Sequence, residues 1–394
     1  MKTFEIIIKT SFGLEEVLIK ELENAGYENV KKLNRAVQVS GTLEDVYRFN
    51  YILRTANKIL LPVAEFKFKN EEDLYKKTKS VSWENYFSND KSFKIDFTVY
   101  SDLIKNTQFA ALKVKDAIVD RFREETNKRP NVEKLNPDVK INLHISDDKC
   151  TLSLDSSGEP LFKRGYRFRG GEAPLKEDLA AGIILLSEWD KQTTFYDLFC
   201  GSGTLLIEAV MIATNTPAGY FRQIFGFQNW LSYDEDLYNR VKNEADSNIT
   251  PTKVKFYGVE RNLQQIRLAR TNVQQAGFIK NIKLIHSDFL QFEPDTGTGY
   301  IVSNLPFGER LTELEQNELN DMYQDLGTYL KHHCVGFGAA LFSSNKEAVN
   351  HIGLKPKRKY KLFNGKIEAT LYLYDLYQGS LKDKVKEDEI KTNF

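Results

Sequence analysis

The sequence predicts an α/β protein in two parts: an amino-terminal α+β region and a carboxy-terminal domain built on a parallel sheet. Up to about residue 155, period-two apolar alternation and helical spacing follow one another, as in small α+β units. From residue 175 onward, short apolar runs are separated by helical segments, which is typical of a parallel sheet. The stretch between them, residues 156–174, is rich in glycine and proline and marks a junction.

Composition sets wide bounds on function. The length of 394 residues predicts more than one domain, and 55 basic residues balance 55 acidic ones, so net charge neither indicates nor excludes a polyanionic partner. The cysteines Cys150, Cys200 and Cys334 are far apart, and the side chains of adjacent His332 and His333 point apart, so we predict neither a disulfide framework nor a metal site. The first residues lack the features of a signal peptide and no run is long enough to span a membrane, so we expect a cytoplasmic protein.

Periodicity places the elements of the first part. The expected strands are residues 4–10, 93–99, 139–145 and 150–155, the last two as a hairpin, and the expected helices are residues 13–26 and a segment carrying Ala111, Val114, Ile118 and Phe122. Within the second strand, alternation predicts that Phe93, Ile95, Phe97 and Val99 point inward. Nothing catalytic stands out in this region.

The junction carries a cationic segment, "FKRGYRFR". Its four cations, with no acidic residue among them, are Lys163, Arg164, Arg167 and Arg169. They alternate with aromatic residues, and aromatic rings stack on unpaired bases while cations contact phosphates. The segment therefore suits single-stranded nucleic acid, although a charged linker between domains would have the same composition.

In the second part, four predicted strands each end in an unusual polar group. After a strongly apolar helix at residues 175–189, these strands end at the Gly201–Thr204 turn, at Glu260, at Asp288 and at Asn304. Ligands of parallel α/β sheets bind outside the carboxyl ends of the strands, at the point where strand order reverses. We therefore expect these groups to line one crevice.

The residue types at these strand ends favour an adenosine-like ligand. Gly201 and Gly203 allow close approach to the backbone at a helix amino terminus, but Leu206 stands where a dinucleotide fingerprint has its third glycine, and no phosphate-loop lysine follows. Glu260 suits a ribose diol, and Asp288 suits the amino group of a base. With a carboxylate at each of the first three strand ends, S-adenosylmethionine fits better than NAD.

The motifs resemble a known family. "DLFCGSGT", "GVERN", "HSDF" and "NLPFGERL" are similar to the successive motifs of class I S-adenosylmethionine-dependent methyltransferases that modify exocyclic amines. "DSSGEPLFKRGYR", "EAPLKEDLAAG" and "FGFQNW" resemble the group with an amino-terminal THUMP domain, an RNA-binding module. That group includes the bacterial enzymes that form N2-methylguanine in large-subunit (23S) ribosomal RNA. The resemblance implies a Rossmann-like methyltransferase domain with a mixed seven-stranded sheet, preceded by a ferredoxin-like and THUMP region.

The resemblance also implies a division of the chain. We expect a ferredoxin-like region at 1–45 that continues into a THUMP RNA-binding domain at 46–155. A basic linker at 156–174 leads to the methyltransferase domain at 175–380, and a charged tail occupies 381–394.

The site residues carried over from the family fall into three sets: those that contact the cofactor, those that act in catalysis and those in the linker that contact RNA. The cofactor, S-adenosylmethionine, is expected to contact Asp197, Phe199, Gly201, Ser202, Gly203, Thr204, Glu260, Asp288, Phe289 and Asn304. The catalytic set is Asn304, Leu305, Pro306 and Phe307. RNA is expected to contact the linker cations Lys163, Arg164, Arg167 and Arg169.

The family chemistry gives each catalytic residue a role. An exocyclic amine is a poor nucleophile because its lone pair is delocalised into the ring. Asn304 Oδ1 and the Leu305 carbonyl would accept its hydrogens and favour the pyramidal form, Pro306 would fix the backbone and Phe307 would stack on the base. A base in a helix must be flipped out for this. The common family motif has proline where this chain has Leu305, which leaves the carbonyl available but the loop less rigid.

The function implied is transfer of a methyl group to guanine N2 in 23S ribosomal RNA, on naked RNA or on a pre-ribosomal particle. An adenine-N6 methyltransferase acting on RNA or DNA is the enzyme alternative, because the motif serves both amines. An RNA-binding assembly factor without catalysis is the other alternative. The target nucleotide and the oligomeric state are not predicted.

Overall fold

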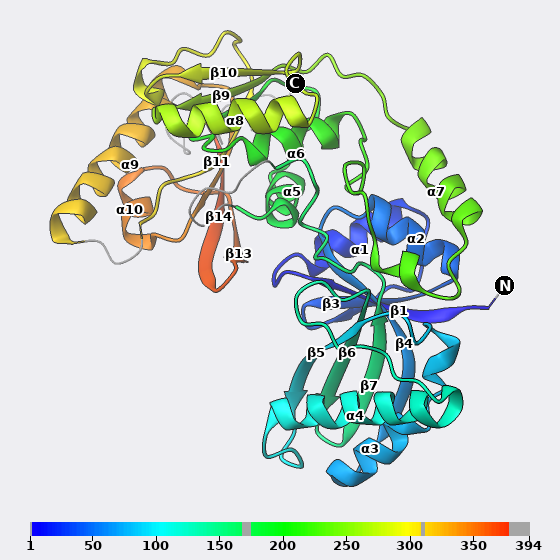
Figure 1. The fold of residues 1–394 in the computed structure, drawn as a ribbon. Helices are drawn as coiled ribbons and strands as arrows, with labels where there is room; N and C mark the ends of the chain where they lie inside the picture. Colours follow the sequence, from blue (N-terminus) through cyan, green and yellow to red (C-terminus); the bar gives the residue numbers. More distant parts are fainter. Residues whose placement is uncertain (1, 168–174, 309–311, 378–394) are drawn as a thin grey trace, which may run out of the picture. The chain divides into compact units, whose positions relative to one another are not determined.

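The computed structural model describes residues 2–167, 175–308 and 312–377, and these form two compact units (Figure 1). The first unit contains residues 2–10, Leu18–Lys163 and Pro217–Ser247. The second contains Ser11–Val17, Arg164–Thr216 and the described residues from Asn248 onward. None of the helices in the described parts of the chain has the length and apolar composition that a membrane crossing requires.

The first unit is built on a seven-stranded sheet with the order β2-β3-β1-β4-β7-β6-β5. Its strands are β1 (Phe4–Thr10), β2 (Lys31–Leu33), β3 (Ala36–Gly41), β4 (Ala56–Lys67), β5 (Phe93–Tyr100), β6 (Val139–Ser146) and β7 (Lys149–Asp155). Neighbours are antiparallel except β5 and β6, which run parallel. The predicted β6–β7 hairpin is confirmed.

Five helices accompany this sheet: α1 (Glu15–Asn24), α2 (Leu43–Ile52), α3 (Glu71–Lys79), α4 (Thr107–Thr126) and α7 (Glu235–Ser247). Helix α4 forms where helical spacing predicted it. Asn106 accepts the amides of Gln108 and Phe109 at its start, and Asn127 ends it in the left-handed region at φ 54°. Its predicted apolar face is buried.

The burial expected of Phe97 is wrong, although its side chain lies on the same face of β5 as that of Phe93. Phe93 in the same strand is fully buried, but the Phe97 side chain is 41% exposed. Strand β5 lies at the edge of the sheet, where neighbours cover a side chain from one side only. Alternation alone cannot distinguish an edge strand from a central one.

The second unit contains a mixed seven-stranded sheet, as the family resemblance implied, with the order β10-β9-β8-β11-β12-β14-β13. Its strands are β8 (Phe195–Asp197), β9 (Phe256–Glu260), β10 (Ile282–His286), β11 (Tyr300–Asn304), β12 (Gly338–Ser343), β13 (Arg358–Asn364) and β14 (Ile367–Asp375). The first five strands in this order are parallel, and β14 and β13 complete the sheet in antiparallel pairs. Strand order reverses between β8 and β11, which makes this the switch point where ligands bind.

The helices of this sheet are α5 (Glu177–Leu186), α6 (Thr204–Ala213), α8 (Leu263–Gln275), α9 (Glu313–His333) and α10 (Lys346–His351). Helices α5 and α6 pack together, and α9 packs against α10 (Figure 1). Apolar side chains of β8, β11 and β12 share one core cluster with those of α9, including Ile301, Leu326 and Leu330. This core holds the carboxyl ends of β8 and β11 in place.

Residues 217–247 pack with the first unit, although they lie within the stretch expected as one continuous methyltransferase domain. The Gly219 amide donates to the Tyr51 carbonyl at 2.7 Å, and the Tyr51 hydroxyl donates to Asp246 at 2.7 Å. Helix α7 packs beside α2 in the same unit. Long-range packing of this kind leaves no local mark in the sequence.

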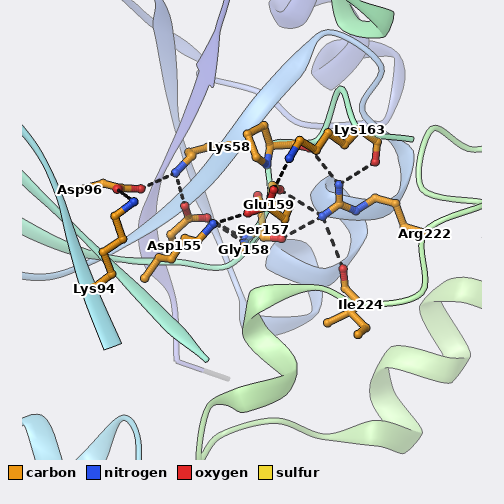
Figure 2. A network of polar contacts seen from close by, with 12 residues as sticks. Lys58, Lys94, Asp96, Asp155, Ser157, Gly158, Glu159, Lys163, Arg222 and Ile224 are labelled. Atoms are coloured by element: carbon orange, nitrogen blue, oxygen red, sulfur yellow. Dashed lines mark hydrogen bonds and ion pairs between the residues drawn. The ribbon is translucent and has the colours of Figure 1, made fainter. Parts of the chain in front are cut away.

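The start of the junction is anchored in the first unit by Arg222 (Figure 2). Its guanidinium donates to five carbonyl oxygens at 2.9–3.4 Å, those of Ser157, Glu159, Pro160, Lys163 and Ile224. Beside it, the Lys58 ammonium joins Asp155 at 2.6 Å and Asp96 at 3.0 Å (Figure 2). The junction therefore begins as an ordered, hydrogen-bonded turn.

Candidate active site

The carboxyl ends of β8 to β11 open into a cavity of about 540 Å³, as the sequence predicted. The expected residues that line it are Phe199, Gly201, Glu260, Asp288, Phe289, Asn304, Leu305, Pro306 and Phe307. Leu198, Arg261, Ser287, Gly308, Met322 and Ile367 complete the lining. Arg261 and Ser287 are chain neighbours of motif residues, whereas Met322 and Ile367 come from α9 and β14 and carry no signal in the sequence.

The glycine loop before α6 reaches the cavity at Gly201. Gly201 and Gly203 have φ of +50° and +82°, in the left-handed region that favours glycine. A Cβ on Gly201 would meet no atom within 4 Å, so space for a ligand lies beside it. The Asn272 amide holds the loop from α8 by donating to the Ser202 carbonyl at 3.0 Å.

Two carboxylates are fixed by backbone amides where their strands end. Glu260 accepts the amides of Gly201 at 3.0 Å and Asn262 at 2.8 Å, one on each oxygen. Asp288 accepts the Leu290 amide at 3.0 Å, which starts the short 3-10 helix Phe289–Gln291. A carboxylate oxygen has two lone pairs, so both side chains can accept further hydrogen bonds in the cavity.

Asp197 lies beneath the cavity rather than in its wall. Its carboxylate is buried, and it accepts the Phe199 amide at 3.2 Å and a hydrogen bond from the Ser303 side chain. Burial raises the pKa of Asp197 to about 7, the two hydrogen bonds oppose this, and the charge of Glu260 adds to it. The expected direct contact between Asp197 and the cofactor stays a prediction.

The raised pKa of Asp197 predicts that stability depends on pH. Its ordinary pKa is 3.8 and its folded value is about 7, so between these values the folded protein keeps a proton that the unfolded chain has released. Stability therefore falls as pH rises through this window, by about 2 kcal/mol between pH 5 and pH 7. Urea unfolding of wild type and Asp197→Asn at both pH values measures this, because the variant lacks the titration. The pKa of Glu177 is also raised to about 7, but Glu177 contributes equally to the pH dependence of both proteins. If the stability of wild type and of Asp197→Asn changed in parallel with pH, the prediction for Asp197 would be contradicted.

The loop after β11 holds the catalytic residues predicted from the family. Asn304 Oδ1 is buried and has no hydrogen-bond partner among the described residues. The Leu305 amide donates to the Phe342 carbonyl at 2.9 Å, and no described residue donates to the Leu305 carbonyl. An unpaired buried acceptor is costly, so this pair of oxygens marks a place for a donor from a ligand.

Tyr323 supports this loop, a role that was not predicted from the sequence. Its hydroxyl donates to the Pro306 carbonyl at 2.8 Å and lies 2.8 Å from the Ser343 hydroxyl. The loop was expected to be less rigid because Leu305 replaces a proline, and this contact restores part of that rigidity. Tyr323 sits on the buried face of α9, where nothing in the sequence distinguishes it from a core tyrosine.

The linker cations do not form the exposed RNA-binding set expected of them. Arg164 is 1% exposed and pairs with buried Glu208, and the Arg167 side chain is 14% exposed and pairs with Glu177. Each of these two arginines compensates a carboxylate on α5 or α6, and the contact with RNA expected of them stays a prediction. Lys163 is exposed and pairs with Glu159, and Arg169 lies outside the described residues.

Thr204 also differs from expectation. It is 5% exposed, does not line the cavity, and its hydroxyl accepts a hydrogen bond from Arg167 at 2.9 Å. Ser202 and Gly203 likewise lie outside the cavity lining. Their expected contact with the cofactor stays a prediction.

Comparison with known proteins identifies the family. A family model described as an RMKL-like methyltransferase domain matches residues 164–372, more than half of the chain. The chain belongs to this family. A THUMP domain model matches residues 68–155, and a model of the RlmL ferredoxin-like domain matches residues 5–60. The RMKL-like domain thus contains the whole cavity.

Curated relatives of this RMKL-like protein are longer than the chain. The ribosomal RNA large subunit methyltransferase K/L of Psychromonas ingrahamii is 39% identical over 373 residues, which are 93% of this chain and 49% of that protein. The protein of the same name from Shewanella frigidimarina is 38% identical, over 95% of this chain and 53% of the relative. The chain spans about half the length of these relatives.

Solved structures match almost the whole RMKL-like protein. SMU.472, crystallised in complex with SAH, has a TM-score of 0.86 at 30% identity and covers 97% of this chain and 100% of its own. A Listeria monocytogenes protein named as a predicted N6-adenine-specific DNA methylase has a TM-score of 0.86 at 29% identity, covering 95% and 97%. TrmN from Thermus thermophilus, at 17% identity and a TM-score of 0.71, shares the fold over 95% of this chain and 100% of its own.

Proposed function

We propose that this RMKL-like protein transfers a methyl group from S-adenosylmethionine to the N2 amine of a guanine in large-subunit (23S) ribosomal RNA. The observation that carries the proposal is the buried, unpaired Asn304 Oδ1. It shares a cavity with the Leu305 backbone, Glu260 and Asp288. The cavity thus combines acceptors for an amine with acceptors for an adenosine.

S-adenosylmethionine is the cofactor, and the residues present fit it. Glu260 can accept hydrogen bonds from the ribose hydroxyls and Asp288 from the adenine amino group, while the open backbone at Gly201 admits the rest of the molecule. When bound, the cofactor supplies an electrophilic methyl group. The structural neighbour SMU.472 was solved with SAH.

The chain's own residues then prepare the amine. Asn304 Oδ1 and the Leu305 carbonyl accept its two hydrogens, which favours the pyramidal nitrogen whose lone pair points at the methyl group. Their positions are preorganised, because the Leu305 amide and the Pro306 carbonyl are held by Phe342 and Tyr323. Phe307 lines the same end of the cavity and offers its ring to stack on the base.

RNA as the substrate is supported by a cationic groove in the THUMP region. The groove, of about 850 Å³, is lined by Tyr75 and by the cations Lys113, Lys115, Arg123, Arg129 and Lys134. Lys115 and Arg123 pair with Asp116 and Asp120, whereas Lys113, Arg129 and Lys134 have no ion pair among the described residues. Lys113 lies over the Tyr75 and Phe109 rings at 5.9 and 5.4 Å. Unpaired cations beside aromatic rings suit phosphates and bases.

Neutralising the unpaired cations is expected to weaken RNA binding. In the triple variant Lys113→Ala, Arg129→Ala, Lys134→Ala, affinity should fall by roughly tenfold or more, and the salt dependence should flatten by about 0.7 per lost phosphate contact. Fluorescence anisotropy with ribosomal RNA fragments over a range of salt measures both. Lys115→Ala with Arg123→Ala is the matched control, since those groove cations are already paired. Equal losses in the two variants would count against the groove.

Methyl transfer to unmodified ribosomal RNA tests the proposed function. Labelled S-adenosylmethionine and RNA that lacks the modification are incubated with the full chain, and the nucleosides are analysed by mass spectrometry. We expect N2-methylguanosine. N6-methyladenosine would overturn the target while keeping the enzyme class, and this second candidate is favoured by the name of the Listeria neighbour. Binding of both ligands without any product, on naked RNA and on ribosomal precursor alike, would indicate an assembly factor.

A further inference from the structure

We propose that Arg167 is a positioning residue for the cofactor loop rather than an RNA contact. It holds Thr204, the first residue of α6, and through it the orientation of the Gly201–Gly203 loop, which lines the cavity at Gly201. The inference rests on the proposed function only in that S-adenosylmethionine is the ligand of this loop.

Arg167 connects the starts of two helices. Its Nη2 donates to Thr204 Oγ1 at 2.9 Å and to the Leu175 carbonyl at 2.9 Å, while its Nε lies 3.1 Å from Glu177 Oε1. Thr204 begins α6, and Glu177 begins α5. All of these side chains are nearly buried, so water competes weakly for the hydrogen bonds.

The preceding linker residues hold the same helix one turn further along. Glu208 of α6 accepts the Tyr166 hydroxyl at 3.0 Å, and its Oε1 lies 3.5 Å from Arg164 Nε. Arg164, Tyr166 and Glu208 are all fully buried. The segment from Arg164 to Arg167 therefore contacts α6 from its first residue into its second turn.

The loop needs such support because it can provide little itself. Two of its three residues are glycines, with no side chains to pack, and both have positive φ. From outside the loop, the Asn272 amide donates to the Ser202 carbonyl and the Glu260 carboxylate accepts the Gly201 amide; within it, the Ser202 hydroxyl lies 3.3 Å from that of Thr204. Neither outside support contacts the helix end of the loop, and there Arg167 holds Thr204. A loop beside a ligand contributes to binding most when its geometry is fixed in advance.

Two substitutions test the inference from opposite sides of one hydrogen bond. Arg167→Met removes the donor, and Thr204→Val removes the acceptor at nearly constant volume. We expect either to weaken SAH binding about tenfold by calorimetry, which corresponds to about 1.4 kcal/mol. The double variant should bind no more weakly than the weaker single variant, because both lose the same contact. Lys163→Met, on the exposed neighbouring cation, is the control and should bind as wild type.

Further measurements separate positioning from general damage. The KM for S-adenosylmethionine should rise in both variants with kcat nearly unchanged, and anisotropy should show unchanged RNA affinity. If Arg167→Met fails to fold, Thr204→Val alone carries the test. Wild-type SAH affinity in the folded variants overturns the inference, as does loss of RNA affinity with SAH binding intact. If wild type itself binds no SAH, the cofactor assignment in the proposed function fails first.

Discussion

Asn304→Ala is expected to lower kcat for methyl transfer by roughly 10²–10³, the usual cost of removing one preorganised polar partner of a transition state. Asn304 Oδ1 is buried and unpaired in the structure, so the free-energy cost of removing it from water is met during folding, before any ligand binds. The amine then gains a strong acceptor without any reorganisation. SAH affinity should change far less, because Glu260, Asp288 and the Gly201 backbone remain.

Single-turnover methyl transfer together with SAH calorimetry measures the two effects separately. Asn304→Asp is the matched control, because it keeps an acceptor oxygen at the same place and should retain most of the activity lost in the alanine variant. A kcat for Asn304→Ala within a few-fold of wild type would show that the amine is activated by other groups, and would remove the main support for the proposed chemistry.

Arg164→Met is expected to destabilise the protein by roughly 3–5 kcal/mol, the range for breaking a buried ion pair from one side. Arg164 and Glu208 are both fully buried, so the variant leaves the Glu208 carboxylate without its cation at a site shielded from bulk solvent. The Tyr166 hydroxyl would still donate to it but cannot neutralise its charge. Urea unfolding at neutral pH measures the loss.

Two controls locate this effect in the buried pair. Lys163→Met removes an adjacent cation whose side chain is 58% exposed, and should change stability by at most about 0.5 kcal/mol. Adding Glu208→Gln to Arg164→Met should recover part of the loss, because the buried charge is then gone. Equal stability of Arg164→Met and Lys163→Met would mean that the buried pair contributes nothing.

The two linker arginines show what composition leaves open. A run of cations and aromatic rings without acidic residues is equally typical of an RNA-binding segment and of a segment whose cations form buried ion pairs. Their acidic partners, Glu208 and Glu177, lie on α6 and α5. Ion pairs between residues distant in the sequence decide which role the arginines have, and a short segment of sequence does not reveal such pairs. The burial expected of Phe97 was wrong for the same reason. The alternation of the strand was correct, but β5 lies at the edge of the sheet, which leaves the ring exposed.

The sequence by itself determined part of the strands and helices of the first unit, the parallel sheet of the second unit and the strand ends that carry the Gly201 turn, Glu260, Asp288 and Asn304. These are local properties, because periodicity and glycine geometry act over a few residues, and parallel strands bring their carboxyl ends to one edge.

Only the tertiary structure decided which polar groups are buried and what compensates them. It buried Arg164 and most of the Arg167 side chain, and it placed Asp197 beneath the cavity. It also added Tyr323 behind the catalytic loop and packed residues 217–247 into the first unit. Burial depends on everything that packs around a side chain, including segments far away in the sequence. The free energy of a charge depends on that burial, so the chemistry of these residues is set by the fold and not by their neighbours in the chain.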